Sequence, residues 1–331
     1  MKTPSLSVII VNYRSWRRLS SCLDALMACR SAGLYPEVIV VDNDSGDGQL
    51  SGFQLRYPDF RFLPNSGNLG FANGCNFGAS MASGEFLLFL NPDTIVTADA
   101  LTGMLELARA NPEYTLLSCR QLNSSGKDDK PCGIFPSLRT LTPLQRAFIR
   151  RIHGGRWPFD NGAEVIFPDW ISGSVVLVRR VEFEAAGGWC DQFFMYYEDV
   201  DLCRRIRDRG GLVALANAIS IVHDHGGASR INRKVKALTK TEVIISRHLY
   251  VHRHFQGRQR TLAQIWLVLD SLFLGRLFPA IAGLLLFFLP SFAVYSRIYL
   301  NLLVYYTGVL RYGSWLSPRS VRHPRRIRMP R

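Results

Sequence analysis

Short runs of apolar residues alternate, along the first half of the chain, with segments whose apolar residues recur at helical spacing. Three runs are continuous enough to be strands buried on both faces of a sheet, at 7–11, 37–41 and 86–90. A helix is predicted between the first two, because leucines recur there at helical spacing, at Leu19, Leu23 and Leu26. A strand, a helix and a strand within about 35 residues predict a parallel pair with a right-handed crossover. The pattern therefore predicts an α/β fold with a mostly parallel central sheet.

Polar residues follow each of these strands. Asn12 follows the first, Asp42 the second, and Asn91-Pro92-Asp93 the third, where proline ends the strand. The carboxyl ends of parallel strands meet at one edge of the sheet, where open α/β sheets bind ligands. A carboxylate such as Asp93 could there hold a divalent cation against a diphosphate. The alternatives are that Asp93 caps the helix expected over 98–110 and that 44–48 is only a turn.

A segment rich in glycine and asparagine, 65–78, leads into a helix expected to reach Met81. Such segments let backbone amides, here around Asn68 and Gly70, approach a phosphate closely. The segment lacks the Lys-Ser/Thr of a P-loop and the glycine spacing of a dinucleotide fingerprint, so it is a weak motif by itself.

The pattern weakens after residue 120. Residues 121–165 are polar and poorly periodic, and we interpret them as a long loop region that lines a cleft. A strand is expected to resume over 170–178, with Gly173 at a point where a substrate could approach the backbone.

Three carboxylates, Glu198, Asp199 and Asp201, stand between an aromatic run and an amphipathic helix that ends at Gly210. Acids in a first helical turn favour the helix dipole, and that explains Asp201 well. Aromatic neighbours also tend to raise the pKa of a carboxyl group toward that of a useful general base. Further on, His223 and His225 follow another short strand, where either a structural or a site role is open.

Charge divides the chain into two parts. The net charge is +14, and residues 230–331 carry 18 Lys and Arg against two acids, so the first 229 residues sum to about −2. The basic part also holds the longest apolar run, which favours an anionic membrane surface over a nucleic acid as partner. We therefore expect a catalytic domain over 1–229 and a helical, membrane-associating region over 230–331.

The uncharged residues 277–296 are numerous enough to span a bilayer, but the last thirteen residues carry six arginines. A single crossing would put that basic tail outside, against the positive-inside tendency. We favour amphipathic or re-entrant helices that lie in the cytoplasmic leaflet. The alternatives are a spanning hairpin, and helices buried against the domain or in a dimer. His248 and His252 are interpreted as interfacial, rather than as metal ligands.

The seven cysteines include no Cys-x-x-Cys pair, so neither a zinc site nor a disulfide framework is indicated. The first strand begins too close to residue 1 for a signal peptide. Both observations favour reduced thiols in the cytosol.

Seven motifs in order resemble the inverting glycosyltransferase family 2, over about residues 5 to 229. They are Val-Ile-Ile-Val-Asn-Tyr, Val-Val-Asp-Asn-Asp-Ser, Asn-x-Gly-Phe-Ala, Leu-Asn-Pro-Asp, Gly-Ser-Val-Val-Leu-Val-Arg-Arg, Tyr-Glu-Asp-Val-Asp-Leu and His-x-x-Gly. The likeness is greatest to the rhamnosyltransferase-like branch. It implies a GT-A fold, a nucleoside-diphosphate sugar donor and a Mg²⁺ or Mn²⁺ ion.

The resemblance also implies roles for single residues. Asp93 matches the metal-binding last Asp of an Asp-x-Asp motif, although Asn91 replaces the first Asp and leaves the metal dependent on Asp93 and the diphosphate. Asp199 matches the catalytic base, with Glu198 beside it, and His223, or His225 in its place, matches a position near the metal. Asp42 matches a position that contacts the pyrimidine base of the donor. The other residues expected to bind the donor are those at strand ends and in the glycine- and asparagine-rich segment, namely Asn12, Asn68, Gly70 and Asn91. Gly173 and Asp201 are expected on the acceptor side.

The resemblance and the basic, apolar end of the chain together predict the reaction. We expect transfer of rhamnose from dTDP-rhamnose to a saccharide on a polyprenyl diphosphate, at the cytoplasmic face of the membrane. The Gln-x-x-Arg-Trp motif of processive enzymes is absent, so one sugar is expected per visit. The alternatives are another donor sugar and a non-catalytic, membrane-bound nucleotide-sugar-binding protein. No nucleic acid is expected as a partner, and oligomers could form through the C-terminal helices.

Overall fold

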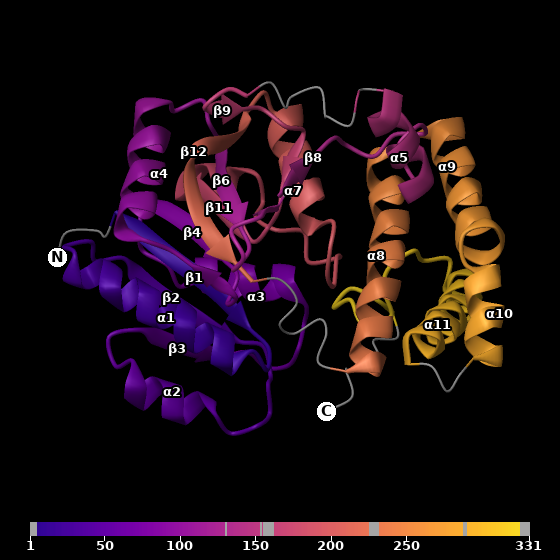
Figure 1. The fold of residues 1–331 in the computed structure, drawn as a ribbon, viewed down its shortest axis with the longest axis horizontal. Helices are drawn as coiled ribbons and strands as arrows, with labels where there is room; N and C mark the ends of the chain where they lie inside the picture. Colours follow the sequence, from indigo (N-terminus) through magenta and orange to yellow (C-terminus); the bar gives the residue numbers. More distant parts are fainter. Residues whose placement is uncertain are drawn as a thin grey trace.

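The computed structural model describes residues 5–129, 131–152, 154, 162–224, 232–286 and 290–324. A mixed, largely parallel sheet forms its centre, with strands in the order β3-β2-β1-β4-β11-β6-β12-β5 (Figure 1). β7 pairs with β6, and β9 with β12, while β8 and β10 form a separate pair. The strands are β1 Leu6–Asn12, β2 Glu37–Asp42, β3 Arg61–Pro64, β4 Phe86–Leu90, β5 Thr94–Ile95, β6 Leu116–Leu122, β7 Asp128–Asp129, β8 Cys132–Gly133, β9 Val165–Ile166, β10 Trp170–Ile171, β11 Val175–Arg179 and β12 Val213–His223.

Helices cover both faces of this sheet. They are α1 Trp16–Ser31, α2 Leu50–Arg56, α3 Phe71–Ser80, α4 Ala98–Ala110, α6 Arg180–Ala185 and α7 Glu198–Asp208. One apolar core joins the sheet to α1 and α4, and the other joins it to α3, α6 and α7. The fully buried β4 lies between them, parallel to β1 and antiparallel to β11. The predicted α/β fold with a mostly parallel sheet is confirmed.

The start of α4 settles one alternative. Thr97 caps this helix, because its hydroxyl oxygen accepts a hydrogen bond from the Ala100 amide at 3.2 Å. Asp93 lies four residues earlier, before β5, so the capping interpretation of Asp93 is wrong. The Asp93 carboxylate therefore does not serve as the cap of α4.

Two sequence expectations for the middle of the chain are wrong. Residues 121–165 are not one long loop, since they include α5, Pro143–Ile152, and short strands that pair with the sheet edge. The strand expected over 170–178 is divided between β10 and β11, which belong to different sheets. Gly173 lies at the break, where the chain passes from one sheet to the other.

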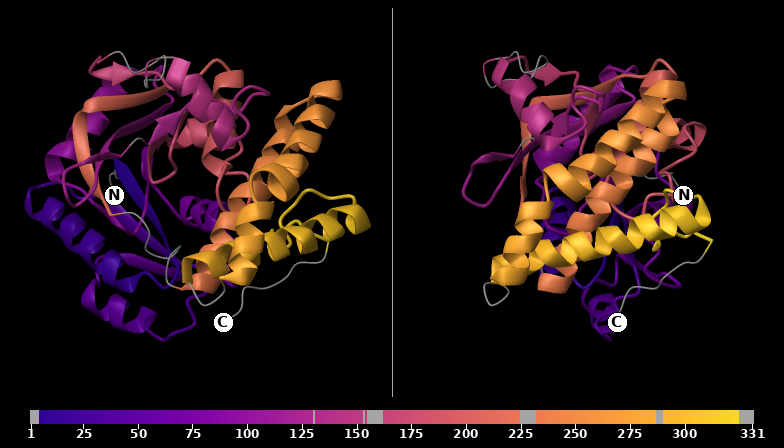
Figure 2. Two further views of the ribbon diagram at one scale, coloured as in Figure 1. Left: turned by 45° about the vertical axis from the view of Figure 1, so that its right-hand side comes forward. Right: turned by 90° about the vertical axis from the view of Figure 1, so that its right-hand side faces the viewer.

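The C-terminal third is helical and packs on the α/β part of the chain (Figure 2). Its elements are α8 Arg233–His254, α9 Gly257–Leu269, the π-helical η2 Asp270–Leu274, α10 Leu277–Leu285 and α11 Pro290–Tyr312. Leu249 and Tyr250 of α8 share a core with Phe193 and Val200 of the α/β part. α11 packs in turn on α8, and its residues Ile298 and Leu302 are buried there. The C-terminal helices therefore form a layer that is continuous with the α/β part through α8.

The apolar run 277–296 does not form one helix. α10 ends at Leu285 and α11 begins at Pro290, and the two helices pack against each other. Gly283 lies so close to the Phe292 carbonyl that a Cβ atom would collide with it, and the Ser296 hydroxyl donates to the Ala280 carbonyl at 2.9 Å. Among the described residues, the helical segment that is long and apolar enough to cross a membrane is instead Gly257–Leu285. Only 17% of its most apolar stretch is buried in the protein.

The end of the described chain returns to α8 and to the loop before α7. Arg319 forms a salt bridge of 2.7 Å with Glu242 of α8, and Arg322 one of 2.9 Å with Asp191 of the aromatic loop. A single membrane crossing would separate these partners, so the structure excludes that arrangement for residues up to 324.

His248 is part of the interior, and its interpretation as interfacial is wrong. It is fully buried in α8, and its two ring nitrogens contact Gln264 Oε1 at 2.5 Å and Tyr306 Oη at 2.8 Å. Its ring stacks on Trp315, and burial lowers the pKa of His248 to about 4. His248 thus joins α8 to α9 and α11 through its contacts with Gln264 and Tyr306.

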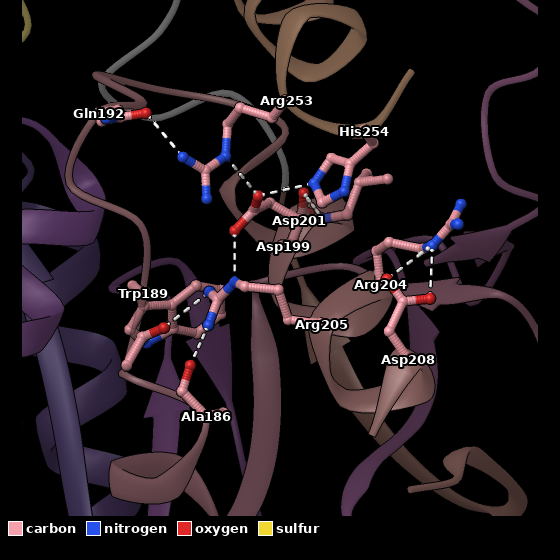
Figure 3. Close-up of polar contacts among 12 residues, drawn as sticks. Ala186, Trp189, Gln192, Asp199, Asp201, Arg204, Arg205, Asp208, Arg253 and His254 are labelled. Carbon is pink, nitrogen blue, oxygen red and sulfur yellow. Dashed lines mark hydrogen bonds and ion pairs between the residues drawn. The ribbon is translucent and has the colours of Figure 1, made fainter. Parts of the chain in front are cut away.

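A buried carboxylate ties α7 to the end of α8. Asp201 is fully buried and accepts hydrogen bonds from Arg205 Nε at 2.8 Å, Arg253 Nε at 3.0 Å and His254 Nε2 at 2.8 Å (Figure 3). Burial alone would raise the pKa of Asp201, but the His254 hydrogen bond and the two arginines outweigh it and hold the pKa at about 2. Asp201 is thus charged in the folded protein at any ordinary pH.

The substitution Asp201→Asn is expected to lower the free energy of unfolding by about 3–5 kcal/mol at neutral pH, because it removes a fully buried carboxylate from two partly buried arginines. The folded pKa of about 2 lies below the unfolded value of ~3.9, so this stabilisation is complete above pH ~4 and is lost as pH falls toward 2. Urea denaturation of both proteins at neutral and acidic pH measures it. The matched control is Asp208→Asn on the same helix, which breaks an exposed 2.8 Å pair with Arg204 and should cost only about 0.3–0.5 kcal/mol. Equal losses in the two variants would contradict the role of Asp201.

Candidate active site

A cavity of about 320 Å³ opens at the carboxyl edge of the sheet, where the sequence predicts a ligand site. Residues from the ends of β1, β2, β4 and β12, from the α7 start and from α8 line it. Eight of the predicted site residues lie in this lining, namely Asn68, Gly70, Asn91, Asp93, Gly173, Glu198, Asp199 and His223. The three others, Asn12, Asp42 and Asp201, are buried behind it or away from it.

Asp93 and His223 face each other at one side of the cavity. β5 pairs antiparallel with the end of β12, which places Thr94 opposite His223 and brings the neighbouring Asp93 alongside. His223 Nε2 lies 3.2 Å from Asp93 Oδ1, and His223 Nδ1 lies 2.7 Å from Gln121 Oε1. Gln121 Oε1 also accepts a hydrogen bond from the Ser174 hydroxyl at 2.9 Å, so it is an acceptor toward His223. In the neutral imidazole Nδ1 therefore carries the proton, and the Nε2 lone pair faces the carboxylate.

These two side chains fit a divalent cation that is shared with a substrate. A carboxylate and a histidine nitrogen that lie 3.2 Å apart at the rim of a cavity are both able to bind the same divalent cation. Within the described ranges no group of three such ligands occurs, so water and substrate oxygens would complete the coordination. Mg²⁺ sites commonly have this composition, with one or two carboxylates and the phosphates of a nucleotide. His225, the alternative to His223, lies outside the described residues.

The glycine- and asparagine-rich segment is fixed to the opposite wall. Asn43 Nδ2 donates to the Gly70 carbonyl at 3.0 Å and to Asn68 Oδ1 at 3.2 Å. Gly70 has a φ of 95° and lies directly against the Phe194 carbonyl, so a side chain at this position is excluded both by its backbone conformation and by space. The Phe71 amide donates to the same carbonyl at 3.1 Å. This glycine therefore locks the predicted donor loop to the aromatic loop that precedes α7.

Asp42 and Asn12 are buried and do not line the cavity themselves. The Asp42 carboxylate accepts hydrogen bonds from the Ser45 hydroxyl at 2.5 Å and from Asn12 Nδ2 at 3.2 Å. Burial raises the pKa of Asp42, and these hydrogen bonds oppose that rise. Both side chains shape the loops after β1 and β2, and their contact with a nucleotide base stays a prediction.

The backbone before Glu198 is strained. Tyr196 and Tyr197 have φ angles of 70° and 67°, in the left-handed region that residues with side chains seldom occupy. Two such residues in succession cost on the order of 1–3 kcal/mol each and persist only where the surrounding structure enforces them. The Ser246 hydroxyl of α8 donates to the Met195 carbonyl at 2.8 Å and helps to hold this segment. The turn delivers Glu198 and Asp199 to the cavity.

Asp199 is held by backbone amides. Its Oδ2 accepts from the Gly173 amide at 3.0 Å and its Oδ1 from the Val200 amide at 2.8 Å. A Cβ atom on Gly173 would lie in ordinary contact, 3.6 Å from the Asp199 Cβ atom. Gly173 thus orients the carboxylate, a function that was not evident from the sequence.

The neighbouring Glu198 has a different environment. It is only 6% exposed, and its Oε2 has no hydrogen-bond partner. Burial and the charge of Asp199 raise the pKa of Glu198 well above its usual range. Burial also raises the pKa of Asp199, but the backbone amides that it accepts from oppose the shift. Burial therefore raises the pKa of both acids, and backbone amides oppose the rise at Asp199, while the charge of Asp199 adds to the rise at Glu198.

Some lining residues were not predicted, including Tyr13, Asn43, Ser172, Tyr196, Val235 and Thr239. Asn43 directly follows Asp42 at a strand end, which is a signal that the strand pattern does contain. Val235 and Thr239 come from α8, beyond the domain boundary expected at 229, and no local pattern indicates them. Asp201 contacts Arg205, Arg253 and His254 rather than the cavity, so its role toward an acceptor stays a prediction without support from this geometry.

Comparisons with known proteins agree with this architecture. The model of the family described as glycosyl transferase family 2 matches residues 7–162. The chain is 28% identical over 242 residues to the N-acetylglucosaminyl-diphospho-decaprenol L-rhamnosyltransferase of Mycobacterium tuberculosis, covering 67% of this chain and 76% of that protein. It is also 28% identical over 229 residues to the low-salt glycan biosynthesis hexosyltransferase Agl10 of Haloferax volcanii, covering 66% of this chain and 67% of the relative.

Solved structures show the same fold at lower identity. The mannosyltransferase PcManGT of Pyrobaculum calidifontis, in complex with GDP-Man and Mn²⁺, superposes with a TM-score of 0.52 at 15% identity, covering 82% of this chain and 70% of that one. The predicted GT-A fold is therefore confirmed. Residues 7–162 thus match glycosyl transferase family 2, and the chain is a glycosyltransferase that is similar to known rhamnosyltransferases.

Proposed function

We propose that this glycosyltransferase moves a single sugar, rhamnose from dTDP-rhamnose, to a saccharide carried on a polyprenyl diphosphate. The observation that supports a transfer reaction most directly is the cavity itself, which has the Asp93–His223 pair on one wall and the amide-held Asp199 on another. The names of the relatives support the sugar and the lipid carrier, since the mycobacterial protein is a rhamnosyltransferase whose name includes a diphospho-decaprenol acceptor.

The wall formed by Asp93 and His223 suits the diphosphate of the donor. We infer that these residues hold Mg²⁺ or Mn²⁺, which would neutralise negative charge on the departing diphosphate. Asn68 and Gly70 present the loop that faces the same cavity, and its position at the α3 start suits an anionic group.

Asp199 supplies the base. As the acceptor hydroxyl oxygen forms its bond to the anomeric carbon, Asp199 takes the hydroxyl proton, and the bond from that carbon to the diphosphate oxygen breaks with its electron pair. A single displacement of this kind inverts the configuration at the anomeric carbon. General-base assistance contributes roughly 10²–10⁴ in rate. The raised pKa of the neighbouring Glu198 disfavours a second negative charge at the reacting hydroxyl.

A donor screen tests the function as a whole. With Mn²⁺ and a polyprenyl-diphosphate-linked sugar, the protein is expected to use dTDP-rhamnose in preference to other nucleotide sugars, and mass spectrometry of the lipid product measures the transfer. NMR of the product should show the anomeric configuration opposite to that of the donor. Preference for another nucleotide sugar would contradict the donor assignment, whereas retention of configuration would contradict the single displacement.

Asp199→Asn is expected to lower kcat by about 10²–10⁴ with donor affinity nearly unchanged, since a base acts only in the transition state. In the wild type, activity should fall as pH drops through the pKa of Asp199, which burial raises above that of an ordinary aspartate. Rates and calorimetric donor affinities measure both effects. The control Asp208→Asn makes the same change on the same helix at an exposed position and should leave turnover unchanged. Turnover of Asp199→Asn within a few-fold of wild type would remove Asp199 from this role.

Asp93→Ala is expected to abolish the gain in donor affinity that Mn²⁺ gives, a loss of about tenfold or more for one charge-assisted contact. Calorimetry with nucleoside diphosphate, with and without Mn²⁺, separates this effect from a general loss of binding. Asp99→Ala, an exposed acid in the first turn of α4, is the matched control and should retain the metal dependence. A wild-type response to Mn²⁺ in Asp93→Ala would contradict the metal assignment.

A further inference from the structure

Three arginines, from α5, from α8 and from the junction of η2 and α10, interact near Tyr197 of the strained turn that precedes Glu198. Arg247 of α8 is only 5% exposed, and its Nε donates to the Tyr197 hydroxyl at 3.1 Å. Arg146 of α5 is partly buried and interacts with the same tyrosine and with the charge of Arg247. Arg276, between η2 and α10, is partly buried within electrostatic reach of Arg247. We name these three residues the arginine cluster.

The arginine cluster has more positive charge than its surroundings neutralise. Asp270 of η2 is the acid that acts on both Arg146 and Arg276, and no salt bridge within 4.0 Å joins it to any of the three in the described part of the chain. Arg146 donates to the carbonyls of Thr140 and Leu141, which carry no formal charge. Burial lowers the pKa of Arg146, which shows the cost of keeping this cation away from water. Three guanidinium groups beside one carboxylate are suited to an additional anion.

The arginine cluster contacts, through Tyr197, the turn that lines the active site. Tyr197 is two residues from Asp199, so their backbones are within about 7 Å of each other. Met195 and Tyr196, on the same turn, line the cavity. A molecule whose anionic group is bound by the arginine cluster could thus extend another part toward Asp199.

An apolar surface adjoins the arginine cluster on its other side. Asp270 and Arg276 belong to the helical segment Gly257–Leu285, most of whose apolar stretch is not buried. Its exposed residues include Phe273 at 53% and Phe278 at 77%. α5, which contributes Arg146, also exposes Phe148 and Ile152, and the preceding Leu141 packs on α8 and α9. The order from the cavity outward is therefore a base, a cationic group and an exposed apolar surface.

We propose that the arginine cluster binds the diphosphate of the lipid-linked acceptor, with the hydrocarbon tail along α9, η2 and α10 and the sugar directed toward Asp199. This inference rests on the proposed function and adds a binding site to it. A sugar joined through a diphosphate to a hydrocarbon chain has the same order of polar, anionic and apolar parts as the protein surface. Guanidinium groups bind phosphate oxygens in a bidentate manner, which an exposed lysine patch would not reproduce.

Arg276→Gln tests the proposal, because no hydrogen bond of this side chain holds the fold together in the described structure. In the full chain in detergent, it should raise KM at least about tenfold for an acceptor sugar on farnesyl diphosphate. KM for the donor, and KM for the same sugar on a neutral alkyl chain, should stay unchanged. Arg276→Lys should restore only part of the loss. The matched control is Arg258→Gln on α9, which removes an exposed charge from the same helical segment and should leave every KM unchanged.

Two further measurements distinguish a diphosphate site from a site for membrane headgroups. Binding of farnesyl diphosphate, measured by calorimetry without donor, should weaken at least about tenfold in Arg276→Gln. If the wild type shows this binding and its dependence on Arg276 yet transfers no sugar, the proposed function fails and the diphosphate site stands. If the wild type transfers sugar and Arg276→Gln matches it with the farnesyl acceptor, the diphosphate site is overturned. The site is also overturned if Arg276→Gln weakens only the binding to vesicles that contain phosphatidylglycerol, since the arginines would then bind membrane headgroups.

Discussion

Three carboxylates, Glu198, Asp199 and Asp201, are buried within the first turn of α7, and contacts from several parts of the structure stabilise them there. An unpaired buried charge is unstable, so each acid needs its own compensation. Asp201 is paired with Arg205, Arg253 and His254 of α7 and α8, Asp199 is held by two backbone amides, and the pKa of Glu198 is raised well above its usual range. The three acids differ in function because their surroundings differ. The helix layer beyond residue 230 is needed for this arrangement, since Arg253 and His254 belong to it.

The positions of the strand ends could be predicted because they depend on local patterns. Continuous apolar runs define β1, β2 and β4, and the polar residues that follow them must meet at one sheet edge. The strand-end pattern therefore accounts for the position of Asp93 at the cavity, whereas Asp199 reaches it from the α7 start, and no strand pattern indicates that Gly173 would orient Asp199. The function of Asp201 could not be predicted, because its partners Arg253 and His254 lie more than fifty residues away. α5 was missed because its apolar residues are exposed and its arginines make the segment polar overall.

The C-terminal third shows how charge and hydropathy can suggest a region but not its geometry. The apolar run 277–296 has the length of a spanning helix, yet Gly283 and Ser296 allow α10 and α11 to pack closely against each other. Small residues at a helix contact favour such close approach, and length alone does not reveal them. The histidine His248 was misplaced for a similar reason, because its partners Gln264 and Tyr306 are brought together only by the packing of three helices.

The return of the chain end to α8 has a consequence for how the protein is made. Glu242 is almost fully buried, and its partner Arg319 follows it by 77 residues. During synthesis α8 therefore emerges from the ribosome well before the cation that its buried acid requires. Domains generally fold as units from the N-terminus onward, but here α8 completes the wall of the cavity with Val235 and Thr239. The packing of α8, and with it this wall of the cavity, can thus be completed only after Arg319 has been synthesised.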